Sequence, residues 1–524
     1  MAGMKVQVVE VDKDGNIDLA HLKALPCAAV STGKWLTPAT LREIPPEDIS
    51  DVCDLIHQHG AQVYLDGADM NARPTTSSVI CNKPCMVTDT MQRLWEQHSF
   101  LLHQCLLLPF ALLFYLLSAA GHLRLTFRYL YLCLGGCALA VLTMGVYSVV
   151  LFIATSVFTL LVCSLCPIRV HAWVFWAQML WQTLCHLVIQ YREGCLHQGV
   201  SVRLFTAVSS LMLLTQRVTS VSMDLQEGKV KLPREAAESW TRFLLSLTSY
   251  VLNFTTLLGG PLYPYSQFAG CVEGIRSRPP WPPLGAVSVK VLQVTLFEWL
   301  RYVLLYCLES HAADASDAGP VGELLWVWGL ALSLRMRYYS HWRISECLNV
   351  AAGFGPDRGD SSSGSRAPNR SGLSDGDPWT TEASTRVSEF ARRWNATTAA
   401  WLRRLVFRRC ESCPVLMTFG FSAWWHGLHL GQCVGFVSWA AAVKADYGLH
   451  RCAGGAALTS TWAKALYAGL GWAHTQMVIT CVVVLVELRS VSSLRVLSSM
   501  YLVAFPLFNV ALCFCFLLKA RIAS

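Results

Sequence analysis

The spacing of apolar and polar residues changes near residue 99. Before that point the two kinds alternate over short distances, whereas beyond it long apolar runs are separated by short polar turns. Residues 129–167 contain no acidic or basic side chain and are long enough for two membrane helices of roughly 20 residues each. The pattern predicts an all-α polytopic membrane protein over residues 91–524.

Further apolar runs predict the remaining membrane helices. They lie at 99–120, 172–189, 204–223, 240–262, 287–308, 321–334, 462–488 and 491–518. The run at 240–262 ends in Gly259-Gly-Pro-Leu-Tyr-Pro-Tyr, and such irregular backbone is tolerated in a membrane only where it is buried in protein or lines a cavity. The aromatic and basic residues that begin at Arg335 predict a membrane interface.

Residues 1–90 read differently from the membrane body. Val6-Gln-Val-Val-Glu-Val and Ala61-Gln-Val-Tyr-Leu-Asp predict buried strands, and the segment between them that ends at Gly60 predicts an amphipathic helix. This predicts a small α/β fragment, too short to close a core of its own.

Composition agrees with a membrane protein. Hydrophobic residues make up 53% of the 524 residues and charged residues 15%, against about 25% charged in soluble domains. The net charge of +8 is concentrated in arginines between 386 and 409, which suits the cytoplasmic face of a membrane better than a nucleic acid. The 21 cysteines are scattered without histidines at zinc spacing, so we expect no metal site.

The segment Phe421-Ser-Ala-Trp-Trp-His-Gly-Leu-His429 carries two imidazoles inside the apolar run 414–443. Burying an imidazole in hydrocarbon is costly, which makes His426 a functional candidate. Upstream, residues 390–406 predict one amphipathic helix with arginines on its polar side. That helix either lies on anionic lipid or contacts the phosphates of a nucleotide-bearing donor. Arg217, inside another apolar run, is either a structural partner or part of a substrate cavity.

A topology argument concerns the same region. If the arginines up to Arg409 and the terminal Lys519 and Arg521 face the cytoplasm, an even number of crossings separates them. The run 414–443 must then enter the membrane and return, with a break at Gly427-Leu-His-Leu-Gly431.

A histidine and an asparagine can together perform acyl transfer from a thioester to a hydroxyl. The imidazole removes the hydroxyl proton at neutral pH, and the amide of Asn395 can donate to the developing oxyanion or hold the base or donor. Burial excludes the water that would hydrolyse the thioester.

Several strings resemble the membrane-bound O-acyltransferase family and its peptide-modifying branch. They are Trp181-Gln-Thr-Leu-Cys-His-Leu, Tyr338-Tyr-Ser-His-Trp, Trp401-Leu-Arg-Arg-Leu-Val-Phe and the Trp-Trp-His-Gly segment. The resemblance implies a bundle of about eleven spans with a transmembrane tunnel, His426 and Asn395 as catalytic residues, and no bound cofactor. Separately from the resemblance, the candidate substrate-binding residues are Arg392, Arg393, Trp394, Trp424, Trp425 and Arg217.

The resemblance also implies a reaction and a place. Octanoyl or another medium-chain acyl group would pass from acyl-CoA to a serine hydroxyl of the proghrelin peptide, in the endoplasmic reticulum membrane and in contact with membrane lipid. A lysophospholipid O-acyltransferase of the same superfamily would use the same pair on a different acceptor. A membrane transporter, from another class, would spread charges along several helices and often shows an internal repeat.

Residues 1–90 resemble glycine decarboxylase, the pyridoxal-phosphate subunit of the glycine cleavage system. The resemblance rests on Asp54-Leu-Ile-His-Gln-His-Gly and Gln62-Val-Tyr-Leu-Asp-Gly-Ala-Asp-Met-Asn. Asp66 would pair with the cofactor's pyridinium nitrogen, but the chain lacks the Schiff-base lysine that lies further on in that family. We therefore expect no pyridoxal-phosphate chemistry, whether the segment is a genuine fusion or an exon of a neighbouring gene.

Overall fold

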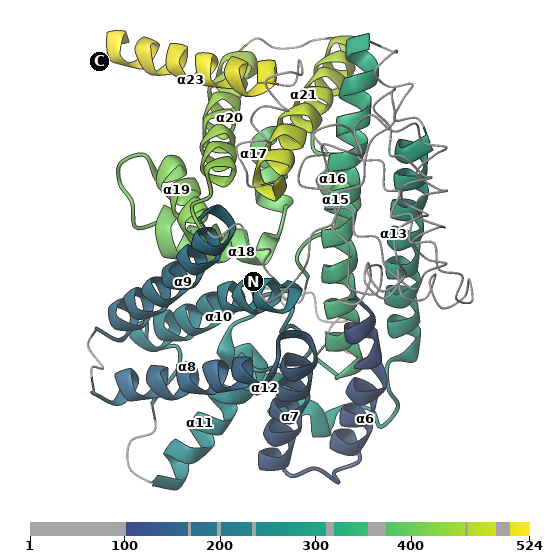
Figure 1. Cartoon of the computed structure of the whole chain (residues 1–524), viewed down its shortest axis with the longest axis vertical. Coiled ribbons are helices and arrows are strands. Elements are labelled where there is room, and N and C mark those ends of the chain that lie inside the picture. Colours follow the sequence, from purple (N-terminus) through teal and green to yellow (C-terminus); the bar gives the residue numbers. More distant parts are fainter. Residues whose placement is uncertain are drawn as a thin grey trace, which may run out of the picture. The chain divides into compact units, whose positions relative to one another are not determined.

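The computed structural model describes residues 101–165, 169–195, 201–232, 237–310, 319–354, 374–455, 460–488 and 503–523, and the regular elements in these ranges are all helical (Figure 1). All of them belong to the second of two units, His98–Ser524. The α/β fragment predicted at 1–90 lies outside the described residues. The helices are α6 (Leu108–Ala119), α7 (Leu125–Met144), α8 (Val146–Leu165), α9 (Val170–Gly194), α10 (Val202–Gln226), α11 (Ala237–Val251), α12 (Tyr265–Gly274), η3 (Ile275–Ser277), α13 (Leu284–Ser310), α15 (Gly319–Ala351), α16 (Pro378–Glu382), α17 (Val387–Arg393), α18 (Ala396–Leu402), η4 (Arg403–Phe407), α19 (Pro414–His426), α20 (Leu430–Gly455), α21 (Thr461–Leu488) and α23 (Ala504–Ala523).

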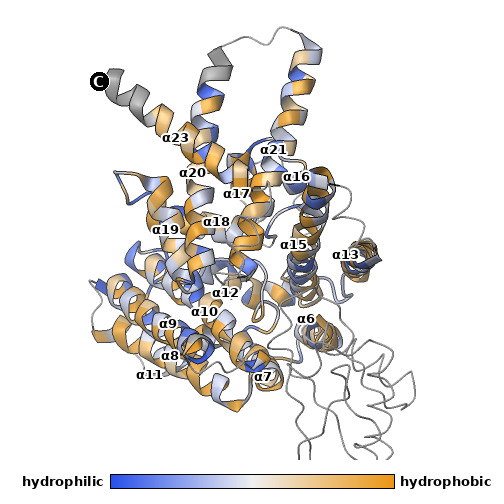
Figure 2. Cartoon of the chain, turned by 45° about the horizontal axis from the view of Figure 1, so that its top comes forward, coloured by the Kyte–Doolittle hydropathy of each residue, from blue (hydrophilic) through white to orange (hydrophobic). Residues whose placement is uncertain are grey.

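Six stretches among the described residues are long and apolar enough to cross a membrane. They are Leu101–Ala119, Leu125–Met144, Val146–Cys163, Val202–Gln226, Leu284–Ser310 and Thr461–Glu487. On α7, Leu132 and Leu139 are fully buried while Leu134 and Leu142 are more than half exposed, as expected of a helix with one face in lipid. Figure 2 shows apolar residues recurring along helices such as α8 and α20. The predicted helical membrane class is confirmed, and the number of about eleven spans stays a prediction.

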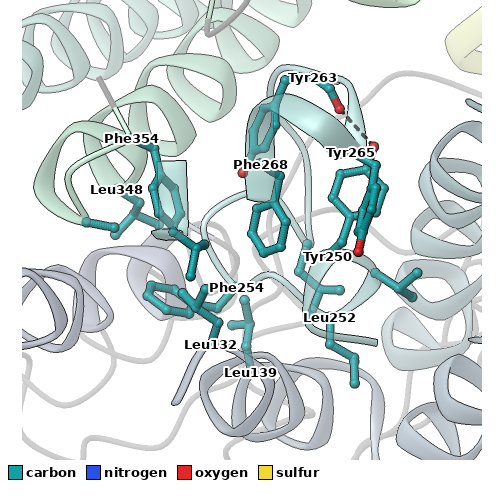
Figure 3. Packing of buried hydrophobic residues seen from close by; sticks show 14 of the residues in the cluster. Leu132, Leu139, Tyr250, Leu252, Phe254, Tyr263, Tyr265, Phe268, Leu348 and Phe354 are labelled. Atoms are coloured by element: carbon teal, nitrogen blue, oxygen red, sulfur yellow. Dashed lines mark hydrogen bonds between the residues drawn. The ribbon is translucent and has the colours of Figure 1, made fainter. Parts of the chain in front are cut away.

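The apolar run at 129–167 forms two helices, as predicted, because the chain breaks at Gly145 with φ of +94°. Its first helix packs closely on the irregular segment 252–264. A Cβ added at Gly136 would lie 1.6 Å from the carbonyl oxygen of Leu252, so only glycine permits this approach. Figure 3 shows the resulting core, where Leu132 and Leu139 lie near Leu252 and Phe254.

The irregular segment 252–264 is held by Arg217 of α10. This guanidinium is 5% exposed and donates to the carbonyl oxygens of Val251 and Thr256 and, at 2.7 Å, to the Thr256 hydroxyl. Backbone freed from a helix inside a membrane needs such internal partners. The hydrogen bonds of Arg217 are therefore those of a structural residue, and a part in a substrate cavity stays a prediction.

Helix α15 extends well beyond the predicted span 321–334 and continues as one helix through Arg335, which is fully buried. A membrane interface at this point stays a prediction. The guanidinium donates to the carboxylate of Glu382 at 2.8 and 3.2 Å and to Gln476 Oε1 at 3.0 Å. A buried charge needs a partner of this kind, and here the partner lies far along the chain.

Candidate active site

The predicted amphipathic helix at 390–406 is broken in the structure. Helix α17 ends at Arg393 and α18 begins at Ala396, because Asn395 adopts a left-handed conformation with φ of +44° and ψ of +61°. Asparagine tolerates this region better than most residues. Its Oδ1 accepts the backbone N–H of Thr398 at 3.3 Å and so caps α18. The prediction of one continuous helix is wrong, and the break makes Asn395 the N-cap of α18.

A second group of bonds fixes the backbone just after Asn395. Ala396 N donates to the carbonyl oxygen of Asp375 at 2.9 Å, and the Thr397 hydroxyl donates to the Asp375 carboxylate. The same hydroxyl accepts the backbone N–H of Leu262 at 3.0 Å. The strained conformation of Asn395 is thus maintained from outside its own helix.

Asp375 is 1% exposed, in the connection that precedes α16. Burial raises the pKa of its carboxyl to about 7, and nearby Glu346 acts in the same direction. The folded chain therefore holds this proton to higher pH than the unfolded chain, whose Asp titrates near 3.9. Because the folded state binds more protons, stability falls as the pH rises from about 4 to about 7 and then levels off, a loss on the order of 4 kcal/mol.

His426 lies at the tip of a helical hairpin formed by α19 and α20. Its ring centroid is 5.0 Å from that of Phe436, and further from the turn Phe419 of α19 lies 5.3 Å from Trp439 of α20. These pairs approach symmetrically on both sides of the break, so the two helices run antiparallel (Figure 1 shows their positions). The chain reverses at the predicted break after His426, whereas entry of this run into a membrane and its return stay a prediction. Helix α19 has 13 residues, about 20 Å, which is less than the ~30 Å hydrocarbon core.

The end of α19 is closed by its own backbone and by α9. Gly427, with φ of +119°, donates to the carbonyl of Trp424 at 3.2 Å, and Leu428 donates to that of Ala423 at 3.1 Å, which is a Schellman motif. The carbonyl of Trp425 accepts Nε2 of Gln182, and that of Gly427 accepts Nε2 of Gln190.

Helix α10 connects the asparagine and histidine segments. Gln216 Nε2 donates to Thr398 Oγ1 at 2.9 Å, and Trp425 Nε1 donates to the carbonyl of Met212 at 3.3 Å. Met212 and Gln216 are four residues apart and so lie on adjacent turns of one helix face. Thr398, which Asn395 caps, and Trp425, which precedes His426, are therefore anchored to α10 about one helical turn apart. The Trp401 ring, 5.2 Å from that of Trp425, fills the space between α18 and α19.

The two arginines among the other predicted substrate-binding residues bond to different parts of the protein. Arg393 donates to the carbonyl of Thr380 at 2.6 Å and pairs with Glu389 at 2.7 Å, while the exposed Arg392 donates to the Tyr447 hydroxyl at 3.3 Å.

The aromatic candidates pack against neighbouring helices. The Trp394 ring packs 4.9 Å from that of Trp342, and Trp424 Nε1 donates to Thr183 Oγ1 at 2.9 Å. Trp424 and Trp425 immediately precede His426 in the sequence, whereas Arg393 serves to hold α16 and α17 together. In the part of the chain that the structure describes, no group of three or more metal-ligating side chains gathers.

Residues 149–486 match the family model described as "MBOAT, membrane-bound O-acyltransferase family". The chain belongs to this family. Among curated relatives of this acyltransferase, membrane-bound ghrelin O-acyltransferase from Rattus norvegicus is 42% identical over 441 residues, covering 82% of this chain and 98% of the relative. Membrane-bound glycerophospholipid O-acyltransferase 1 from Mus musculus is 25% identical over 379 residues, covering 66% of this chain and 74% of that protein.

The resemblance to glycine decarboxylase is also confirmed. Mitochondrial glycine dehydrogenase (decarboxylating) from Homo sapiens is 57% identical over 79 residues, which are 14% of the acyltransferase chain and 7% of that protein. A match of this extent covers only a small part of the relative.

Sequence reasoning missed the residues that support the two catalytic candidates. Gln182 and Gln190 lie eight residues apart on a helix whose outward side is apolar, and amide side chains in such a setting require buried partners. That signal was present in the sequence. Asp375 gave no such signal, because its partner Thr397 lies 22 residues further along the chain and belongs to an ordinary glycosylation sequon, Asn395-Ala-Thr397.

Proposed function

We propose that the chain transfers octanoyl, or another medium-chain acyl group, from acyl-CoA to a serine hydroxyl of the proghrelin peptide at the endoplasmic reticulum membrane. The observation that carries the site assignment is the anchoring of the Asn395 and His426 segments to adjacent turns of α10. The substrate follows from a relative named for ghrelin acylation, of which this chain spans 98% at 42% identity.

The proposed chemistry uses His426 as the general base. An imidazole nitrogen accepts the serine hydroxyl proton while the serine oxygen bonds to the thioester carbonyl carbon. The carbon–sulfur bond then breaks, the imidazolium returns the proton to the departing thiolate, and the products are the serine ester and free CoA. His426 is half-buried, and its packing against the rings of Trp425 and Phe436 covers part of the imidazole, which reduces the water that can compete with the serine.

Asn395 has one end of its amide committed and the other available. Its Oδ1 accepts the Thr398 backbone N–H, which fixes the orientation of the amide. Its Nδ2 has no acceptor among the described residues, so this donor is the end that can face a substrate. An N–H donor directed at the carbonyl oxygen stabilises the charge that develops there, an effect of about 10²–10³ in rate.

The test is acyl transfer in microsomes that carry the full chain. Octanoyl-CoA is offered with a short ghrelin N-terminal peptide or with a lysophospholipid, and His426→Ala is compared with His474→Gln. His474 is a matched control, because it is an imidazole that bonds Asn509 at 3.3 Å and Gln can keep that bond. We expect peptide octanoylation that is lost in His426→Ala and kept in His474→Gln. Transfer to the lysolipid alone would contradict the proposed acceptor.

A further inference from the structure

A row of polar side chains on α9 faces the end of α19. Gln182, His186 and Gln190 are spaced four residues apart and so lie on one side of the helix. Figure 1 shows α9 beside α10, below the hairpin. The outward side of the same helix is apolar and exposed, as at Leu180, Leu184 and Val188.

The two amides of this row, Gln182 and Gln190, donate to the backbone carbonyls of the residues immediately before and after His426. The Schellman motif satisfies the carbonyls of Ala423 and Trp424 but leaves those of Trp425 and Gly427 without backbone partners. These two carbonyls are the ones that accept Gln182 and Gln190. A buried carbonyl that loses such a donor is left unpaired at a cost of about 1–3 kcal/mol.

The amide of Gln182 is itself oriented by a third helix. Thr215 Oγ1 of α10 donates to Gln182 Oε1 at 2.7 Å, which turns Nε2 towards α19. Gln182 is 1% exposed, so its position is set by packing on every side.

His186 occupies the middle of the row and abuts the residue after His426. A Cβ added at Gly427 would lie 2.7 Å from Nδ1 and 2.9 Å from Cγ of His186. Glycine is therefore required at position 427 for two reasons. Its backbone is left-handed, and the His186 imidazole occupies the space that a side chain at 427 would need.

We propose that Gln182, His186 and Gln190 are positioning residues for His426, and that Thr215 orients the first of them. They touch no reacting atom; they hold the backbone on both sides of the base against α9. This inference rests on the proposed function, since it assumes that His426 is the base.

The experiment compares Gln182→Leu and Gln190→Leu with Gln178→Leu in the full chain. Gln178 is a matched control one turn earlier in the same row, 6% exposed and with no hydrogen-bond partner for its Nε2 among the described residues. Initial rates of octanoyl transfer give kcat, and KM for both peptide and octanoyl-CoA, normalised to folded protein. We expect kcat to fall about 10- to 100-fold in the first two variants with both KM values unchanged, because a displaced base loses near-attack geometry. The control should retain its kcat.

Thr215 supplies a rescue test. Thr215→Val removes the hydroxyl and should lower kcat in the same way as Gln182→Leu, whereas Thr215→Ser keeps it and should restore the rate. An unchanged kcat in Gln182→Leu and Gln190→Leu would overturn the proposal, as would a rise in KM at constant kcat or a loss of folded protein alone. Full activity in His426→Ala would instead defeat the proposed function, so the two failures are distinguishable.

Discussion

Gly427→Ala is expected to disable the enzyme while leaving the bundle folded. An L-residue in the left-handed conformation of Gly427 costs about 1–2 kcal/mol. The new methyl would lie 2.7 Å from His186 Nδ1, and overpacking of this kind costs about 1–3 kcal/mol. If the hairpin tip relieves this strain by moving, His426 moves with it. The two costs together amount to about 2–5 kcal/mol, which is the free energy needed to return His426 to its reactive position. Added to the activation barrier, it corresponds to a rate loss of about 30-fold to a few thousand-fold.

The assay is octanoyl transfer to the peptide, with Gly420→Ala as a matched control in the same helix. A Cβ at Gly420 meets nothing within 4 Å, so this variant should keep its rate. In the double variant Gly427→Ala/His186→Ala the overlap disappears and only the backbone strain remains. The fold loss in rate of the double variant should therefore be smaller than the product of the fold losses of Gly427→Ala and His186→Ala. The reasoning would be refuted if Gly427→Ala kept full activity. It would also be refuted if the fold loss of the double variant equalled the product of the two single fold losses.

Three further predictions concern the supporting structure. Asp375→Asn keeps an acceptor for Thr397 but removes the group that titrates near pH 7, so thermal unfolding in detergent should show it more stable than the parent at pH 8 and equal at pH 4; the same difference at every pH would contradict the pKa argument. Glu382→Ala leaves Arg335 buried and unpaired and should cost about 3–5 kcal/mol, seen as a lower Tm, whereas an unchanged Tm would show that the pair is not required. The sequon Asn395-Ala-Thr397 should carry no glycan, because the arginine-rich segment that contains it is expected to face the cytoplasm, where glycans are not added; an endoglycosidase shift that disappears in Asn395→Gln would refute this.

The sequence predicted those features that depend on local pattern. The apolar run at 129–167 was predicted to form two helices and does, although only the structure places their break at Gly145. The glycine at 427 marked the hairpin turn, because backbone freedom is readable from residue type. The failures came from partners distant in sequence. The burial of Arg335 could not be predicted, because Glu382, which permits it, lies 47 residues away.

The break at Asn395 was missed for a different reason. Phe390, Trp394, Trp401 and Leu405 keep a helical spacing through the break, since one left-handed residue between two short helices barely disturbs the apolar period. The pattern that suggests one helix therefore also fits two. Only the bonds of the following residues to Asp375 reveal where the chain turns.

The central claim is that His426 and Asn395 act together on one reacting carbonyl. The most direct measurement is the octanoyl-transfer rate of His426→Ala, Asn395→Ala and the double variant, each in the full chain and normalised to folded protein. We predict a loss of about 10²–10⁴ for His426→Ala and about 10²–10³ for Asn395→Ala, with the double variant no slower than the slower single. A double variant whose loss equals the product of the two, or a His426→Ala chain that transfers octanoyl at the full rate, would contradict the account.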